Sequence, residues 1–283
     1  MSPLSRIVTD YHMHSTFSPD AHDPPAELCR RALALGFTEI AITEHAEWHP
    51  VRQQDGFPNA DGYFAAMAQV QAEFEPLGLT VYTGIELGNP QDYPSQAAEL
   101  VAAYPFDLVI GSLHWLYGEN LQSTACFANR DPYQVYTDYF VELERMVASF
   151  DFEMVAHFDR IFYRGVLLGA NFESDRLEPI VRKTLATVAR YGRALEINTR
   201  YLKHTPNWNE ALVTMLRWFL EEGGSRVAVN SDAHRAAELG RNLEPATEIL
   251  TRAGFKLPAQ LLTVQPPANR VRIGPLFNHN RPR

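Results

Sequence analysis

Short apolar runs alternate with longer segments of helical periodicity along most of the 283-residue chain. The apolar runs are continuous rather than alternating, which is typical of parallel strands buried on both faces. We predict strands at 6–9, 39–43, 80–85, 108–113, 154–156, 194–198 and 227–231. Apolar residues at helical spacing predict helices at 26–35, 63–74, 95–103, 133–150, 177–191, 209–222 and 243–253.

This order of elements predicts the α/β class. Each strand is followed by a helical pattern before the next strand, as repeated βα units require. Because parallel crossovers are right-handed, the units favour a closed or nearly closed barrel. We expect one domain over residues 1–264 and a tail over 265–283, where Pro, Asn and Arg are frequent.

Composition narrows the function classes. The net charge is −9, which argues against a broad nucleic-acid or membrane surface, so we expect neither partner. The two cysteines, Cys29 and Cys126, form no disulfide framework, and Cys29 lies in a helical pattern that predicts core packing. The chain shows neither an apolar leader nor a run long enough to span a membrane. We therefore expect a cytoplasmic protein.

Potential metal ligands stand at the ends of six predicted strands. They are His12, His14, His45, Glu86, His114, His157, Asp232 and His234, and a loop brings Asp20 back towards the first pair. The carboxyl ends of barrel strands share one face, so these residues should converge. Singly, each histidine could be a hydrogen-bonded core residue, and Asp232 could cap a helix. Together they favour a site for about two to three Zn, Mn or Fe ions, with Glu86 as bridge.

The order of these motifs resembles the PHP (polymerase and histidinol phosphatase) superfamily, and its histidinol-phosphate phosphatase branch in particular. The motifs are Asp10-x-His12-x-His14, Thr43-Glu44-His45, Gly84-Ile85-Glu86, Gly111-Ser112-Leu113-His114, Ala156-His157-Phe158-Asp159, Glu196-Ile197-Asn198 and Ser231-Asp232-Ala233-His234. Glu44 stands where many family members have Asp.

The resemblance implies a distorted (β/α)7 TIM-like barrel with a trinuclear site. One metal would bind His12, His14, Glu86 and Asp232. A second would bind Glu86, His114 and His157. A third would bind Asp20, His45 and His234. In the phosphatase branch, arginines near the fifth and sixth strand ends hold phosphate, and Arg160 and Arg200 occupy those places here.

We therefore expect a metal-dependent phosphoric monoester hydrolase that acts on L-histidinol phosphate in histidine biosynthesis. Asp159 and metal-bound water are both candidates for protonating the leaving group. Glu47, Trp48, Asp159 and Glu196 could bind the substrate's ammonium and imidazole groups. The alternatives are a phosphoesterase for nucleotides or nucleic-acid ends, a phosphotyrosine phosphatase, and a metal-binding module without catalysis.

Overall fold

A seven-stranded parallel sheet forms the centre of the computed structural model, which describes residues 7–52, 55–202 and 206–265. Its strands lie in the order β1 (Thr9–Asp10), β2 (Glu39–Ala46), β3 (Thr80–Gly88), β4 (Leu108–Ser112), β7 (Met154–Val155), β8 (Ala194–Asn198) and β9 (Val227–Asn230). Every neighbouring pair is parallel. The predicted βα barrel is therefore confirmed, while almost all of the predicted tail lies outside the described residues.

The segments that follow β1 and β9 close the barrel. His14 N donates to Ala233 O at 2.8 Å, and Asp232 N donates to His12 O at 2.9 Å. A parallel bridge also pairs Met13 with Ala233. Because regular β1 pairing covers only Thr9–Asp10, these later contacts carry the closure, and they involve the segments that bear predicted ligands.

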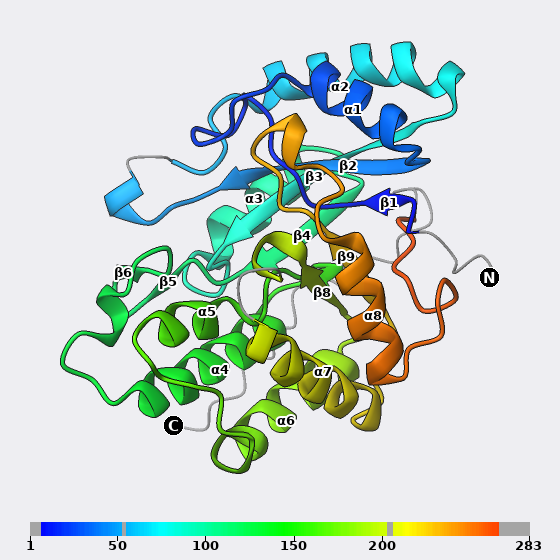
Figure 1. The fold of residues 1–283 in the computed structure, drawn as a ribbon. Coiled ribbons are helices and arrows are strands. Elements are labelled where there is room, and N and C mark those ends of the chain that lie inside the picture. Colours follow the sequence, from blue (N-terminus) through cyan, green and yellow to red (C-terminus); the bar gives the residue numbers. More distant parts are fainter. Residues whose placement is uncertain (1–6, 53–54, 203–205, 266–283) are drawn as a thin grey trace, which may run out of the picture.

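Helices surround the sheet on its outer side (Figure 1). They are α1 (Pro25–Leu35), α2 (Ala60–Phe74), α3 (Pro94–Ala103), α4 (Pro132–Ser149), α5 (Arg160–Leu167), α6 (Ser174–Arg190), α7 (Pro206–Glu221) and α8 (Leu243–Ala253). The N–H of Gly36, at φ 76°, caps the carbonyls of Ala32 and Leu33, so α1 ends where the sequence predicts.

The strand residues divide between two cores. Ile40 and Ile42 belong to the large core shared with the helices, whereas Ala41 between them belongs to the barrel interior. This division follows from the alternation of side chains along a strand. Small residues such as Ala156, Ala194 and Ala228 line the interior, and Leu262 and Val264 from the chain after α8 fill it further.

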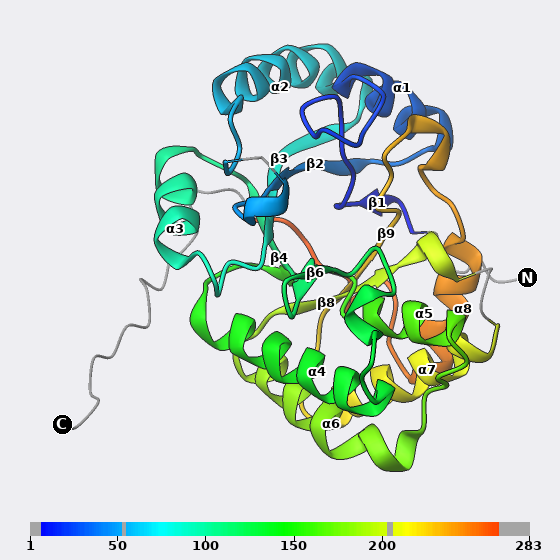
Figure 2. The ribbon, with the colours of Figure 1, turned by 90° about the vertical axis from the view of Figure 1, so that its left-hand side faces the viewer.

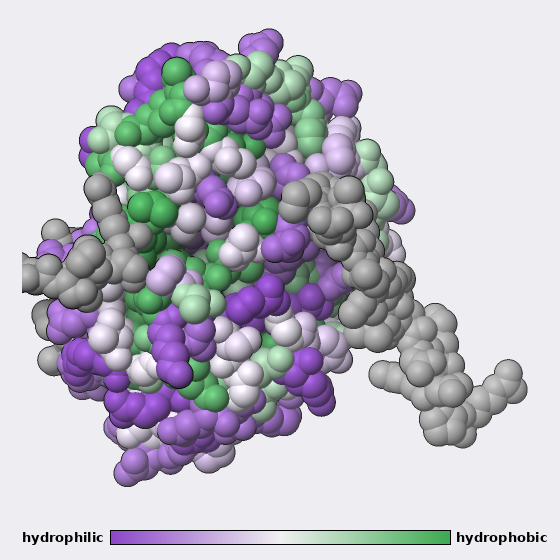
Figure 3. Space-filling model, turned by 90° about the vertical axis from the view of Figure 1, so that its right-hand side faces the viewer, coloured by the Kyte–Doolittle hydropathy of each residue, from purple (hydrophilic) through white to green (hydrophobic). Residues whose placement is uncertain are grey.

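Besides five short 3₁₀ helices, a hairpin and one α-helix in the described chain were not predicted. The loop after β4 contains a hairpin of β5 (Trp115–Leu116) and β6 (Glu119–Asn120). The segment after β7, predicted to be a loop, contains α5. Both lie at the carboxyl ends of the strands, the side that faces the viewer in Figure 2. On the opposite side, hydrophilic and hydrophobic residues are interspersed (Figure 3). Among the described residues, no helix is long and apolar enough to cross a membrane.

Candidate metal centre

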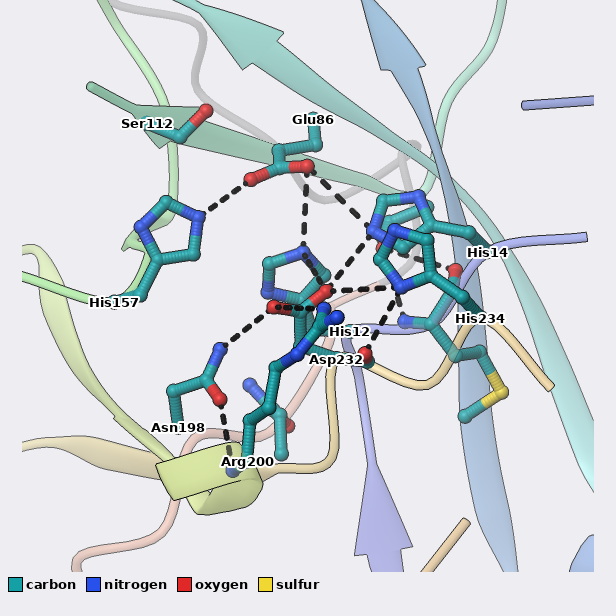
Figure 4. Close-up of polar contacts among 12 residues, drawn as sticks. His12, His14, Glu86, Ser112, His157, Asn198, Arg200, Asp232 and His234 are labelled. Atoms are coloured by element: carbon teal, nitrogen blue, oxygen red, sulfur yellow. Dashed lines mark hydrogen bonds and ion pairs between the residues drawn. The ribbon is translucent and has the colours of Figure 1, made fainter. Parts of the chain in front are cut away.

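Glu86 lies within a cup of imidazoles at the carboxyl ends of the strands, and Figure 4 shows its contacts with His157, His12 and His14. Its carboxylate is 1% exposed. Oε1 lies 2.9 Å from His157 Nε2 and 3.1 Å from His114 Nε2. Oε2 lies 2.7 Å from His45 Nδ1, 3.4 Å from His12 Nε2 and 3.6 Å from His14 Nε2. One carboxylate therefore faces five imidazoles from four strand ends, because His12 and His14 both follow β1.

The remaining predicted ligands lie at the edge of the same cup. Asp232 Oδ1 is 3.4 Å from His14 Nε2 and 3.5 Å from His234 Nδ1. Asp20 Oδ1 is 3.4 Å from His45 Nε2 and 3.7 Å from His234 Nε2. All nine residues that the strand-end pattern singled out are thus brought together.

The donor atoms fit divalent ions. Three groups could each hold an ion: His12, His14 and Asp232; His14, His45 and His234; and His45, Glu86 and His114. Within each group the ligand atoms lie within 4.8 Å of one another. Buried polar atoms normally have hydrogen-bond partners, yet Nε2 of His12 and Nε2 of His14 make no hydrogen bond to any residue that the structure describes. Buried imidazole nitrogens that face carboxylates without hydrogen bonding suit a site built for cations.

The histidines in the cup stabilise the ionised forms of its carboxyl groups. Burial disfavours the ionised form of Glu86, but His114, His12 and His45 hold its pKa well below the usual range. Burial acts likewise on Asp20, and His45, His14 and His234 lower its pKa to about 2. Both carboxyl groups are therefore available as anionic ligands at neutral pH.

Two of the predicted ligands hold an unusual backbone conformation. His157 has φ 27° and Asp232 has φ 49°, values that non-glycine residues rarely adopt and that cost free energy. The backbone N–H of His157 donates to Glu196 at 2.6 Å, and that of Asp232 donates to His12 O. The ends of β7 and β9 are therefore held in a strained form that turns both side chains into the cup.

Two buried carboxylates lie behind the imidazoles, a role that the sequence did not reveal. Glu196 Oε1 is 2.7 Å from His12 Nδ1. Glu47 contacts His114 Nδ1 and accepts a hydrogen bond of 3.2 Å from Trp115 Nε1. Glu196 is 0% and Glu47 1% exposed, so the expectation that they meet substrate is not supported by their positions. The sequence feature that could have pointed to this role is the position of each residue: Glu47 follows the end of β2, and Glu196 lies within β8.

The predicted phosphate-binding arginines lie beside the cup. Arg160 begins α5, and its Nη1 is 3.4 Å from His157 Nε2. Arg200 follows β8, and its Nη1 is 3.8 Å from Asp232 Oδ2. Asn198 Nδ2 also donates to that oxygen at 3.1 Å. Both arginines are partly exposed, so their guanidinium groups can reach an anion that enters the cup.

Asp159 lies next to Arg160, and Trp208 Nε1 donates to its Oδ2 at 2.9 Å. Burial raises the pKa of Asp159 to about 6. Glu44 is also buried, and burial raises its pKa to about 7 although Ser15 and Ser18 donate to it. Glu44 therefore stabilises the loop after His14, because its carboxylate accepts hydrogen bonds from the hydroxyl groups of Ser15 and Ser18.

A family model, described as the PHP domain, matches residues 10–200, which is more than half of the chain. This chain belongs to the PHP domain family. The match confirms the resemblance found in the strand-end motifs, and it covers the PHP barrel from β1 to the arginine that follows β8.

Curated relatives of this PHP chain cover most of its length. It is 27% identical over 248 residues to the histidinol-phosphatase of Lactococcus lactis, covering 87% of this chain and 91% of the relative. It is 28% identical over 250 residues to a probable histidinol-phosphatase of Thermotoga maritima, covering 87% and 93%.

The fold is also similar to a solved structure. The histidinol phosphate phosphatase from Lactococcus lactis, complexed with zinc, L-histidinol and phosphate, matches with a TM-score of 0.80 at 25% identity. The alignment covers 92% of this chain and 97% of that one. These relatives support metal-dependent phosphatase chemistry in the PHP barrel.

Proposed function

We propose that this PHP protein hydrolyses L-histidinol phosphate to L-histidinol and phosphate. The observation that carries the proposal is the cup itself, in which Glu86 faces five imidazoles while Arg160 and Arg200 stand beside it. Relatives named as histidinol-phosphatases align over almost the whole chain, which supports this substrate over other phosphate monoesters.

We assign about two to three divalent ions, Zn, Mn or Fe, to the cup. The proposed ligand sets are His12, His14, Glu86 and Asp232; Glu86, His114 and His157; and Asp20, His45 and His234. The three groups found by geometry overlap these sets and distribute some histidines differently. When bound, such ions act as Lewis acids towards phosphoryl oxygens and supply a nucleophile near neutral pH.

The chain's other residues handle the substrate. Arg160 and Arg200 donate hydrogen bonds to the phosphate and orient it over Glu86, because a guanidinium matches two phosphoryl oxygens at once. Asp159 donates a proton to the departing alcohol oxygen of histidinol. Trp208 Nε1 donates to Asp159 Oδ2 at 2.9 Å and so fixes the orientation of the carboxyl group. The substrate is thus a small phosphate monoester.

Phosphate release tests the proposal. The protein is stripped with a chelator, reloaded separately with Zn²⁺, Mn²⁺ or Fe²⁺, and assayed with L-histidinol phosphate, AMP and a phosphotyrosine peptide. We expect metal-dependent release with the highest kcat/KM for L-histidinol phosphate. A preference for AMP or for the peptide would contradict the substrate assignment. Metal binding without release from any monoester would favour a non-catalytic metal-binding protein.

A further inference from the structure

Two of the cup's histidines have one ring nitrogen facing Glu86 and the other against a buried carboxylate. His12 Nε2 faces Glu86 at 3.4 Å, and its Nδ1 contacts Glu196 at 2.7 Å. His114 Nε2 faces Glu86 at 3.1 Å, and its Nδ1 contacts Glu47. These carboxylates approach the cup from opposite walls, Glu196 from β8 and Glu47 from the segment after β2.

The other histidines have weaker support. His14 Nδ1 lies 3.4 Å from the hydroxyl of Ser18, and His234 Nδ1 lies 3.1 Å from a backbone oxygen of Asp232. Among the described residues, His157 Nδ1 makes no hydrogen bond. His45 Nδ1 lies 2.7 Å from Glu86, which is itself a proposed ligand. His12 and His114 differ in that the carboxylate behind each ring belongs to none of the proposed ligand sets.

We propose that Glu196 and Glu47 are positioning residues, which fix the proton of His12 and His114 on Nδ1 and so direct the Nε2 lone pairs into the cup. This inference rests on the metal centre of the proposed function. A carboxylate accepts a proton but has none to give when ionised, so it selects the tautomer protonated on the nearer nitrogen. Both carboxylates are buried, so water does not compete for these contacts.

Glu196 also connects three strand ends. It accepts the backbone N–H of His157 at 2.6 Å and the amide of Asn230 at 2.8 Å, in addition to the ring of His12. Since His157 has φ 27°, its strained backbone depends on a strong acceptor at that position. One carboxylate on β8 therefore aligns ligands that come from the ends of β1 and β7.

Glu47 has a matching built environment. Trp115 Nε1 donates to its Oε2 at 3.2 Å, which leaves Oε1 for His114. A Cβ at Gly88 would lie 2.4 Å from Glu47 Oε1, so any larger residue there would displace the carboxylate. The sequence Gly84-Ile85-Glu86-Leu87-Gly88 thus provides both the bridging ligand and the space for the carboxylate behind His114.

The test compares Glu196→Gln and Glu47→Gln with Glu39→Gln. Glu39 also accepts side-chain hydrogen bonds, from Tyr11 at 2.7 Å and Tyr82 at 3.3 Å, but it begins β2 at the far end of the strand from His45. A glutamine amide can donate to Nδ1 and so favours the opposite tautomer. We expect Zn²⁺ affinity, measured by competition with a chromophoric chelator, to fall about 10–100-fold in the first two variants and to stay unchanged in Glu39→Gln.

A second readout separates positioning from general stability. In Zn²⁺-loaded wild-type protein, ¹⁵N–¹H spectra of the imidazoles should show His12 and His114 protonated on Nδ1, which requires no variant to fold. Protonation on Nε2, or unchanged Zn²⁺ affinity in both folded Gln variants, would overturn the positioning role alone. Wild-type protein that binds no divalent ion would instead refute the metal centre, and with it the proposed function.

Discussion

Replacing Arg200 by Ala isolates phosphate binding from metal binding. The Arg200 side chain is 35% exposed, and its ion pair with Asp232 Oδ2 spans 3.8 Å. An ion pair of this kind contributes at most about 1 kcal/mol to stability. Asp232 keeps the 3.1 Å hydrogen bond from Asn198. This proposed metal ligand should therefore stay in place when the guanidinium is removed, and we expect unchanged metal content.

The loss in activity follows from the missing hydrogen bonds to phosphate. A hydrogen bond to a charged group contributes about 1.5–3 kcal/mol. Since about 1.36 kcal/mol corresponds to a factor of ten in rate, kcat/KM for L-histidinol phosphate should fall roughly 10- to 150-fold. Arg200→Lys keeps the charge without the two-pronged donor, so it should restore only part of the activity.

The assay measures phosphate release against substrate concentration, with metal content determined on the same samples. Arg217→Ala serves as the matched control, because Arg217 lies on α7 and donates to the carbonyl of Arg252 at 3.2 Å. We expect wild-type kinetics for the control. Unchanged kcat/KM in Arg200→Ala, or loss of metal from it, would refute the role assigned to Arg200.

Three further predictions use other parts of the fold. Asp159→Asn should lower kcat for histidinol phosphate about 10²–10⁴-fold. It should lower kcat for p-nitrophenyl phosphate much less, because nitrophenolate leaves without needing a proton. Equal losses of kcat with both substrates would contradict proton donation by Asp159. A Cβ at Gly165 would lie 1.7 Å from the Tyr136 hydroxyl, so thermal unfolding should show that Gly165→Ala destabilises the fold by about 1–3 kcal/mol. Adding Tyr136→Phe should recover part of this loss, and an unchanged melting temperature in Gly165→Ala would refute the clash. Burial raises the pKa of Cys29 to about 12 and that of Cys126 to about 11, so few of these thiols are ionised at pH 8. A thiol reagent should therefore react slowly with the native protein at pH 8, and faster as the pH rises towards those values. Rapid labelling of the native protein at pH 8 would contradict the burial of both thiols.

The barrel was predictable because its strands are buried on both faces. Ile40 and Ile42 face the helices while Ala41 faces the interior, so apolar residues continue along the strand and mark it clearly. The convergence of the candidate ligands was predictable for a related reason, since parallel strands place their ends together whatever their separation in sequence. Their assignment to particular ions was not predictable from the strand order.

The elements around the cup were harder to predict because tertiary contacts form them. Helix α5 has eight residues and no side-chain N-cap, so its sequence alone favours helix weakly. Phe162 anchors this helix to the core: its ring centroid lies 4.6 Å from that of Tyr136 and 4.7 Å from that of Trp208. In the β5–β6 hairpin, Tyr117 takes φ 55°, a value uncommon for tyrosine, although Gly118 after it favours such a turn.

Glu47 and Glu196 show the limit of motif reasoning. Both are acidic residues near the cup, and no sequence pattern distinguishes a carboxylate that meets substrate from one that supports a histidine. Their burial and their contacts with ring nitrogens favour the second role, support of a histidine. That distinction depends on side-chain direction at the end of each strand.

The metal content of the purified protein tests the central claim most directly. After chelation and reloading, elemental analysis of the wild type and of Glu86→Gln gives the number of ions per chain. We predict about two to three equivalents of divalent metal in the wild type and a clear loss in the variant, because the carboxylate proposed to bridge the ions is gone. A wild-type chain that retains no divalent metal, or a Glu86→Gln chain that retains all of it, would contradict the account.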